Sequence, residues 1–381
     1  MYDTIVIGLG GMGAAAAYHL ARRGMRVLGL EQYALGHAQG SSHGQSRIIR
    51  KAYFEHPDYV PLLDRAYTHW DELARGASVE LMNLCGIVMA GDSADAVIAG
   101  TRRAAAEHGL PLVELDPAAL HTRFPGLRPA PEMATLFDPL GGYLRVERCV
   151  KAHLDGARAA GAELRDREPV FAWEPTADGV RVTTSLGVYA ARNLVLCAGP
   201  WAGELLRDLS LPFSAHRVVT GWFPSGLPEH RVENGAPVFA MQTPAGFFYG
   251  FPQLDDRGVK IAEHRAGARL DDPAVIDRTI TGEDIRPLQE FARQYLNGVQ
   301  TDSWTGSTCI YTMTPDSDFI VDRHPAHDNV FIAAGFSGHG FKFASAIGAI
   351  LADYCERGKT EAPVGFLGLA RRGLHPAGRG A

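Results

Sequence analysis

The sequence predicts an α/β protein of mixed α+β type, and three observations carry that prediction. Residues 3–7, 14–23 and 25–31 read as strand, helix and strand around the turn "GLGGMG", which makes a βαβ unit. Residues 216–264 hold four short segments of alternating apolar residues, a pattern typical of an antiparallel sheet. Residues 329–358 again read as strand, glycine turn and helix. We therefore expect a Rossmann-like domain interleaved with an antiparallel-sheet domain.

The elements between these blocks follow no regular βα alternation, so a βα barrel is not expected. Apolar residues at helical spacing predict helices at residues 59–74, 94–109, 144–161 and 283–296. Strand-like segments occur at residues 79–91, 170–175, 180–185 and 193–199, and around Cys309. The predicted ranges are 1–82, 144–210 and 310–381 for the Rossmann-like domain, and 83–143 and 211–309 for the other domain.

Charge and cysteine usage limit the partners of this 381-residue chain. It has 37 Lys and Arg against 43 Asp and Glu, a net charge of −6 that is spread along the sequence. No nucleic-acid or membrane partner is expected, and the predicted partner is a small molecule. The cysteines form no CxxC pair and lie near no histidine cluster, so neither zinc nor a disulfide framework is predicted.

Two further expectations concern location and the C-terminus. No apolar run is long enough to span a membrane, and the first strand follows Met1 directly, so we expect a soluble, cytoplasmic protein. Residues 370–381 are rich in glycine and arginine without apolar periodicity, and we expect them to form a frayed tail.

The turn in the first βαβ unit predicts a dinucleotide site. Gly8, Gly10 and Gly13 satisfy G-x-G-x-x-G, in which glycines permit the tight turn, the approach of a pyrophosphate and close packing of helix on strand. The helix N-terminus offers free N–H groups to phosphates. Glu31 ends the second strand, where a carboxylate can accept hydrogen bonds from the adenosine ribose. The alternative is a purely structural glycine turn.

This motif does not distinguish FAD from NAD, because both contain adenosine diphosphate. Two later strands, in "NLVLCAGPWA" and "NVFIAAGFSGHGFKF", also end in glycine, as expected if one long cofactor crosses several strand ends. FAD is therefore favoured. Gly335, Gly338 and Gly340 would let N–H groups face the flavin pyrimidine edge, where reduction builds negative charge. A glycine-capped helix entry is the alternative for this segment.

Several polar residues could act on a substrate. Arg47 and Arg50 could hold the flavin and a substrate carboxylate, or could form a solvated basic patch. Lys342 lies among apolar and small residues, where a buried ammonium requires an anionic partner. Lys260 and His264 lie four apart on one strand face, where the usual alternative is a pair of exposed side chains.

Five segments spread over nearly the whole chain carry a family resemblance: "VIGLGGMG", "GQSRIIRKAY", "FYGFP", "TCIYTMTPDSDFIVD" and "AAGFSGHGFKFAS". They resemble the monomeric sarcosine oxidase family, which includes N-methyltryptophan oxidase. The resemblance implies an FAD enzyme that oxidises a secondary amine, an N-methyl or cyclic amino acid, to an imine. The imine then hydrolyses, and O2 is reduced to H2O2. It also implies a monomer.

The resemblance implies roles for individual residues. FAD would be attached covalently through its 8α-methyl group to Cys309, and Arg47 would lie close to the ring. Lys260 would assist oxygen activation, and Arg50 and Lys342 would bind the substrate carboxylate. Residues expected to line the substrate cavity are His264, Tyr249 and Tyr311. Further residues expected to bind the cofactor are Met12, Gln32, His43, Ile48, Val170 and Gly199.

The chain departs from the family pattern at three positions. Ser42 and Gln45 stand where relatives commonly have histidine and aspartate, and Ala240 stands where sarcosine-specific relatives have a bulkier methionine. The smaller side chain leaves room, which predicts a substrate larger than sarcosine. Three alternatives stay open: an NAD-linked dehydrogenase, a flavin dehydrogenase with another electron acceptor, and a flavin-binding protein without turnover.

Overall fold

A computed structural model describes residues 1–375. The first of the two large sheets has parallel strands at its centre. β1 pairs in parallel with both β2 and β12, and β12 pairs in parallel with β20. A hairpin extends one edge, and a short strand extends the other. The eight strands are β1 (Tyr2–Ile7), β2 (Val27–Leu30), β9 (Glu163–Arg165), β10 (Val170–Thr176), β11 (Gly179–Thr184), β12 (Val188–Leu196), β19 (Ile320–His324) and β20 (His327–Ala334).

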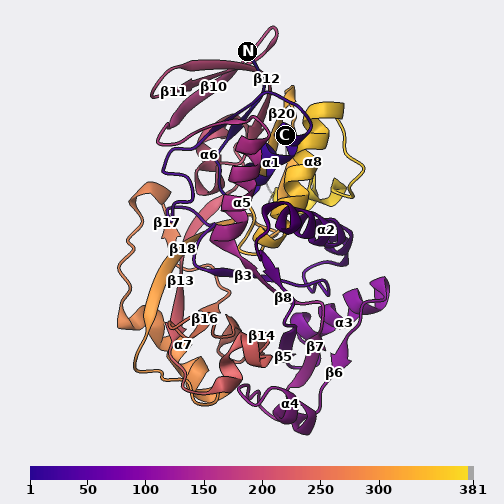
Figure 1. Ribbon diagram of the computed structural model, residues 1–381, viewed down its shortest axis with the longest axis vertical. Coiled ribbons are helices and arrows are strands. Elements are labelled where there is room, and N and C mark those ends of the chain that lie inside the picture. Colours follow the sequence, from indigo (N-terminus) through magenta and orange to yellow (C-terminus); the bar gives the residue numbers. More distant parts are fainter. Residues whose placement is uncertain (376–381) are drawn as a thin grey trace.

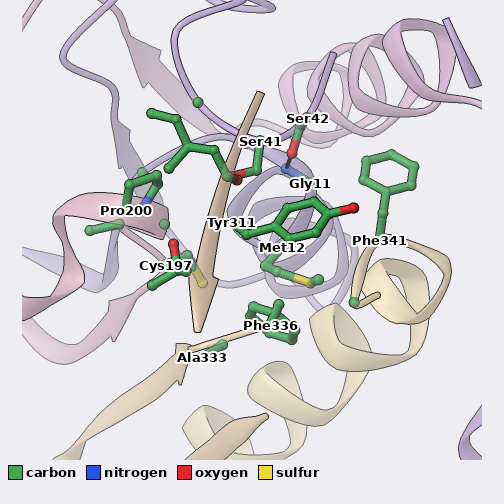
Figure 2. A pocket seen from close by; sticks show the side chains of 18 of the residues that line it. Gly11, Met12, Ser41, Ser42, Cys197, Pro200, Tyr311, Ala333, Phe336 and Phe341 are labelled. Carbon is green, nitrogen blue, oxygen red and sulfur yellow. Dashed lines mark hydrogen bonds between the residues drawn. The ribbon is translucent and has the colours of Figure 1, made fainter. Parts of the chain in front are cut away.

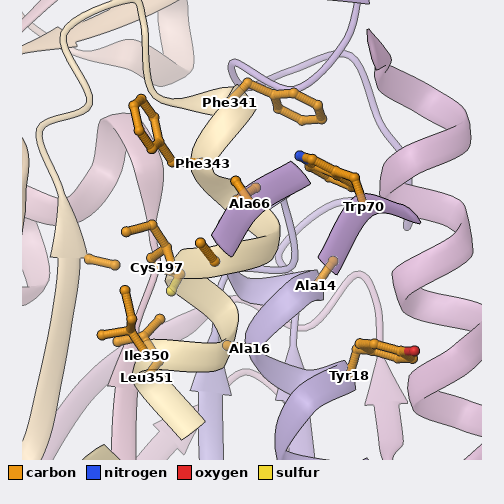
Figure 3. Close-up of a cluster of buried hydrophobic side chains, with 14 of the residues drawn as sticks. Ala14, Ala16, Tyr18, Ala66, Trp70, Cys197, Phe341, Phe343, Ile350 and Leu351 are labelled. Atoms are coloured by element: carbon orange, nitrogen blue, oxygen red, sulfur yellow. The ribbon is translucent and has the colours of Figure 1, made fainter. Parts of the chain in front are cut away.

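Helices bury one face of this sheet. They are α1 (Gly11–Arg22), α2 (Val60–Ala77), α5 (Val146–Ala159) and α8 (Ala344–Arg357), and the short α6 (Ala202–Leu205) follows β12. α1 is central, because its run of alanines and glycines lets both α5 and α8 approach closely. The largest apolar cluster lies here, and Figure 3 shows part of it, with side chains from α1, α2 and α8.

The second sheet has nine strands and is mostly antiparallel. Its strands are β5 (Ile87–Gly91), β6 (Val113–Glu114), β7 (Ala134–Asp138), β13 (Ser214–Phe223), β14 (Val238–Thr243), β15 (Gly246–Phe251), β16 (Val259–Glu263), β17 (Arg269–Leu270) and β18 (Thr305–Met313). α7 (Gly282–Tyr295) packs on it through Phe291, whose ring stacks on Phe239 and Phe248. α3 (Ala96–His108) and α4 (Pro117–Arg123) complete this part of the chain.

A small third sheet lies between the two large ones (Figure 1). It pairs β3 (Ser46–Ile49) with β8 (Gly142–Arg145), and β8 with β4 (Met82–Asn83). The helix expected from residue 144 begins only at Val146, because residues 142–145 pair as β8. β3 carries Arg47, so this sheet fixes one of the predicted functional residues.

The predicted fold class, a mixed α/β protein with a Rossmann-like sheet and an antiparallel sheet, is confirmed. The predicted frayed tail is wrong for residues 370–375. Arg371 forms an ion pair with Asp316 at 2.7 Å, and Leu374 is fully buried, so tertiary contacts hold this segment. The rest of that prediction, residues 376–381, lies outside the described residues. Among the described residues, no helix has the length and apolar character needed to cross a membrane.

The contact between α1 and α8 depends on glycine at position 348. A Cβ atom there would lie 2.5 Å from the Ala15 carbonyl carbon, so Gly348→Ala forces the helices apart and should lower the free energy of unfolding by about 1–3 kcal/mol. The matched control is Gly76→Ala, in α2, where a Cβ meets nothing within 4 Å. Denaturant unfolding should show a loss for the first variant and none for the second, and equal midpoints would contradict the packing argument.

Candidate active site

One elongated cavity of about 270 Å³ lies at the carboxyl ends of the parallel strands. Its lining begins near Glu31 at the end of β2, passes the ends of β1, β12 and β20, and reaches His264 of the second sheet. Figure 2 shows side chains from the glycine turn, from β18 and from the segment after β20 converging around it. Ligands of open α/β sheets bind at this edge.

The glycine turn brings a helix N-terminus to one wall of the cavity. Gly8 has φ +85°, and a Cβ at Gly13 would lie 1.7 Å from the Gly8 carbonyl oxygen, so α1 packs directly on the end of β1. Gly10 and Gly11 line the cavity. The N–H group of Gly11 donates to the Ser42 hydroxyl at 3.0 Å, which shows that polar groups already collect at this helix end.

Glu31 is held rigidly at the end of β2. Its two carboxylate oxygens accept hydrogen bonds from the backbone N–H groups of Leu9, at 2.9 Å, and Tyr33, at 3.0 Å. The His37 ring nitrogen lies 3.2 Å from the same carboxylate. The carboxylate is buried but still lines the cavity, so its unused lone pairs can accept from ribose hydroxyl groups.

Cys309 and Arg47 form a second wall. Cys309 is 6% exposed on β18, and its Sγ lies 3.5 Å from Nη2 of Arg47. The same guanidinium donates to the Ser41 and Ser46 carbonyl oxygens at 2.9 Å each, which fixes its position. Both residues line the cavity, so a thiol and a permanent cation face the same space.

Arg50 and Glu55 form a buried ion pair at the other end. Nη2 of Arg50 donates to Glu55 at 2.6 Å, and its Nη1 donates to the Ala52 carbonyl oxygen at 2.8 Å. The guanidinium lies over the rings of Tyr53 and Phe54, 4.3 and 4.2 Å from their centroids. Although burial acts to raise it, the Arg50 guanidinium holds the pKa of Glu55 below its usual value, so Glu55 is ionised.

Lys342 faces the same end through a short hydrogen-bond chain. Its Nζ donates to the His339 carbonyl oxygen at 2.8 Å and to the Tyr53 hydroxyl at 3.4 Å. Nε2 of His339 faces the Ser317 carbonyl oxygen, so it must donate, and Nδ1 must then accept from Tyr53. Burial, reinforced by Arg50, lowers the pKa of Lys342 to about 7.

The wall between these ends is aromatic. The Tyr311 hydroxyl lies 3.4 Å from the Tyr249 hydroxyl and 3.4 Å from Nδ1 of His264. Burial lowers the pKa of His264 to about 4, so its ring is neutral at physiological pH. Phe247 packs edge-to-face on Phe54 and completes the apolar part of the wall.

The structure brings most of the predicted site residues to this cavity and leaves three of them outside it. The predicted residues that line it are Gly8, Gly10, Met12, Glu31, Gln32, Arg47, Ile48, Arg50, Val170, Gly199, Tyr249, His264, Cys309, Tyr311, Gly335, Gly338, Gly340 and Lys342. Gly13 packs α1 against β1, His43 is buried nearby, and Lys260 does not line the cavity.

Lys260 lies in an enclosed site of its own. Its Nζ donates to the carbonyl oxygens of Gly44, at 2.6 Å, and Ser46, at 2.9 Å. It also faces the rings of Trp222 and Phe251 at 5.4 and 4.8 Å. Burial, followed by the charge of Arg47, lowers its pKa well below the usual value.

Several lining residues were not predicted from the sequence. Glu55 was not anticipated, because nothing in its local sequence shows that the chain folds it back onto Arg50. Four of the others lie in or beside motifs recognised in the sequence, but only tertiary structure brings them to the cavity: Ser42, Trp201, Phe336 and Phe341. Phe54 and Phe247 lie outside those motifs.

A Rossmann-like sheet whose glycine turn, helix N-terminus and buried acid border one long cavity defines a dinucleotide-binding protein. The chain belongs to the DAO family of FAD dependent oxidoreductases, whose model matches residues 3–354. The family match favours FAD over NAD.

Individual relatives are similar over almost the whole chain. The monomeric sarcosine oxidase of Streptomyces avermitilis is 43% identical, covering 99% of each chain. An N-methyl-L-tryptophan oxidase of Escherichia coli is 36% identical, over 94% of this chain and 96% of its own. The solved structure of NikD, described as an unusual amino acid oxidase essential for nikkomycin biosynthesis, superposes with a TM-score of 0.85. Its sequence identity is 26%, over 98% of this chain and 99% of the NikD chain.

Proposed function

We propose that this protein is an FAD-dependent amine oxidase that converts a secondary amino acid to an imine, with O2 as electron acceptor. The observation that carries the proposal is the pair of buried cations, Arg50 and Lys342, at the opposite end of a dinucleotide cavity from Glu31. The relatives named sarcosine oxidase and N-methyl-L-tryptophan oxidase support the same substrate class.

The residues present fit an FAD molecule. Gly10 and Gly11 leave the helix N-terminus open to a pyrophosphate, Glu31 can hold the ribose, and Gly335 and Gly338 border the far part of the cavity. When bound, FAD would supply the redox chemistry, a two-electron oxidation at the carbon next to nitrogen coupled to the two-electron, two-proton reduction of O2. Water would then hydrolyse the imine to a carbonyl group and an amine, which leave as two molecules from an N-methyl substrate and stay in one molecule when the imine is cyclic.

Arg50 and Lys342 would bind the substrate carboxylate. Lys342 uses two of its three N–H donors on His339 and Tyr53, so one remains for a ligand. Arg50 is already paired with Glu55, and an incoming carboxylate must share or replace that partner. Two anchors on one carboxylate would fix which C–H bond faces the flavin, so these residues contribute mainly by positioning.

The surroundings favour a neutral amine. An ammonium substrate would be repelled by Arg50 and Lys342, and removal of hydride requires the nitrogen lone pair. His264 is neutral because burial lowers its pKa to about 4, and burial raises the pKa of Tyr311 well above its usual value, so its hydroxyl keeps its proton. These groups can exchange hydrogen bonds with the amine without charging it.

The side-chain end of the cavity supports a substrate larger than sarcosine. Ala240 is 3% exposed and lines the cavity together with Phe54 and Phe247. A small residue beside two aromatic rings leaves an apolar recess for a cyclic amino acid, or for an N-methyl amino acid that carries a side chain on its α-carbon, which sarcosine lacks.

Lys260 would assist the reduction of O2. Its ammonium lies near Arg47 and Cys309, which both line the cavity, and in an enclosed site a fixed positive charge stabilises a developing negative charge strongly. No carboxylate forms an ion pair with Lys260 among the described residues, so its charge is not neutralised locally.

We also propose the remaining features as expected from the sequence: a cytoplasmic monomer divided into an FAD domain and a substrate domain. The free cysteines suit a reducing compartment. We place the last domain boundary after Met313, because β18 pairs along its length with β13 of the second sheet.

A screen of substrates tests the function. The purified protein should be yellow, and its flavin should bleach anaerobically when a suitable secondary amino acid is added and recover with release of H2O2 in air. N-methyl amino acids with apolar side chains, proline and pipecolate should bleach it faster than sarcosine. A colourless protein, or a yellow one that no secondary amine reduces, would exclude the proposal.

We propose that FAD is attached covalently to Cys309, whose Sγ lies on the cavity wall beside Arg47. Cys309→Ser should therefore give a protein whose yellow colour is lost to the filtrate after acid precipitation, whereas the unchanged protein keeps it in the pellet. Cys197→Ser, which alters another cysteine that lines the cavity, is the control and should keep the colour bound. Flavin that stays bound to the Cys309→Ser polypeptide would refute the attachment site.

Carboxylate binding should weaken as pH rises through about 7, because Lys342 then loses its proton. The protonation states of its neighbours do not change between pH 6 and 9: the pKa of Glu55 is lowered, that of His339 is about 3, and that of Tyr53 is raised well above its usual value. Propanoate has no amine to titrate. Its dissociation constant, followed by flavin absorbance, should be at least about tenfold higher at pH 9 than at pH 6. Lys342→Met should bind weakly at both pH values, and constant affinity in the unchanged protein would contradict the assignment.

A further inference from the structure

The ammonium of Lys260 is held by one tight turn of the chain. The turn consists of Gly44, Gln45 and Ser46, and the first and third of these accept the hydrogen bonds from Nζ described above. Two carbonyl oxygens that flank one residue can both face the same cation only if the backbone curls around it. Gly44 has φ +90° and Gln45 has φ +75°, which are consecutive left-handed conformations.

Gln45 adopts this conformation at a cost. A residue with a Cβ atom loses about 1–2 kcal/mol in the left-handed region relative to ordinary helical backbone. Such strained residues persist only where surrounding contacts determine them, and they concentrate at functional sites. The contacts that hold Gln45 are therefore as informative as its backbone angle.

The side chain of Gln45 is fixed at both ends of its amide. Nε2 donates to Asp255 at 2.8 Å, and Oε1 accepts from the indole N–H of Trp222 at 2.8 Å. The backbone N–H groups of Gly44 and Gln45 both donate to one oxygen of Glu147, at 2.7 and 3.0 Å. The turn is thus held from outside by its donors, while its carbonyl oxygens point inward at Lys260.

Trp222 links this anchor to the ammonium itself. It is 2% exposed, and its N–H group holds Gln45 while its ring faces Nζ of Lys260. The guanidinium of Arg257 lies 4.9 Å from the centroid of the same ring, and Arg257 forms an ion pair with Asp255. The charged groups that act on Lys260 include Arg47, Glu147 and Arg257.

We propose that Gln45 is a positioning residue for Lys260: through Asp255 and Trp222 its side chain locks the left-handed turn that aims two carbonyl oxygens at the ammonium. The proposal rests on the proposed role of Lys260 in assisting the reduction of O2, for which the two electrons would come from the reduced flavin. With the turn locked, the amine of Lys260 is fixed, and the two carbonyl oxygens favour its charged form against the effect of burial. With the turn loose, the ammonium loses its acceptors and its position.

The test compares Gln45→Gly with Ser78→Gly. Both replace a left-handed residue by glycine, but Ser78 is exposed at the end of α2 and far in sequence from the turn. Stopped-flow mixing of the reduced protein with O2 should show reoxidation slowed about tenfold in Gln45→Gly, with reduction by substrate unchanged. Ser78→Gly should match the unchanged protein in both half-reactions. Asp255→Ala, which removes the outer anchor of Gln45 and also the partner of Arg257, should slow reoxidation in the same direction.

A second measurement reports on Lys260 without turnover. In protein labelled with ¹³C at lysine Cε, NMR titration should give a lower pKa for Lys260 in Gln45→Gly than in the unchanged protein, because the charged form has lost its acceptors. Lys260→Met assigns the signal within a small set of lysines: Lys51, Lys151, Lys260, Lys342 and Lys359. An unchanged Lys260 pKa together with normal reoxidation would overturn the proposal.

A double variant separates the two possible failures. If Lys260 assists O2 reduction, Lys260→Met slows reoxidation, and adding Gln45→Gly slows it no further, because Gln45 acts through Lys260. Additive losses would overturn the positioning role and leave the role of Lys260 intact. Normal reoxidation in Lys260→Met would instead refute the proposed function of that lysine.

Discussion

The contact between Gly13 and the carbonyl of Gly8 is the constraint on which the site depends. With no side chain at position 13, α1 begins directly against the end of β1, and its free N–H groups border the cavity. The small residues that follow in α1 let α5 and α8 pack on either side of it. The position of α1 therefore also fixes α8, and with it the short segment that carries Lys342.

Four buried or partly buried cations lie in or near the cavity, and they are stabilised in different ways. Arg50 has a carboxylate partner in Glu55 and two aromatic rings beside its guanidinium. Arg47, Lys260 and Lys342 bond mainly to backbone carbonyl oxygens. Carbonyl oxygens solvate a cation without cancelling its charge, so the field reaches the cavity and favours bound or developing negative charge.

The two sheets contribute different parts of this arrangement. The parallel sheet supplies turns and helix ends that suit a dinucleotide, whereas the antiparallel sheet supplies Tyr249, His264, Tyr311 and Cys309 as a continuous wall. β3, from the small sheet between them, brings Arg47 to the place where both meet. The proposed cofactor region and the proposed substrate region are thus built mainly on different sheets.

The sequence by itself determined the fold class, the glycine turn and fewer than half of the residues that line the cavity. These depend on local patterns: strand, turn and helix in register, and motifs that match a family. Tertiary structure alone decided the rest. Residues 142–145 form a strand because β3 and β4 pair with them, and residues 370–375 are held in place because Arg371 forms an ion pair with Asp316. The pairing of Glu55 with Arg50, and the enclosure of Lys260 by the turn at Gln45, join segments that carry no local signal for one another. Those contacts set the charges of the site, since the burial and hydrogen bonding that shift a pKa exist only once the chain has folded.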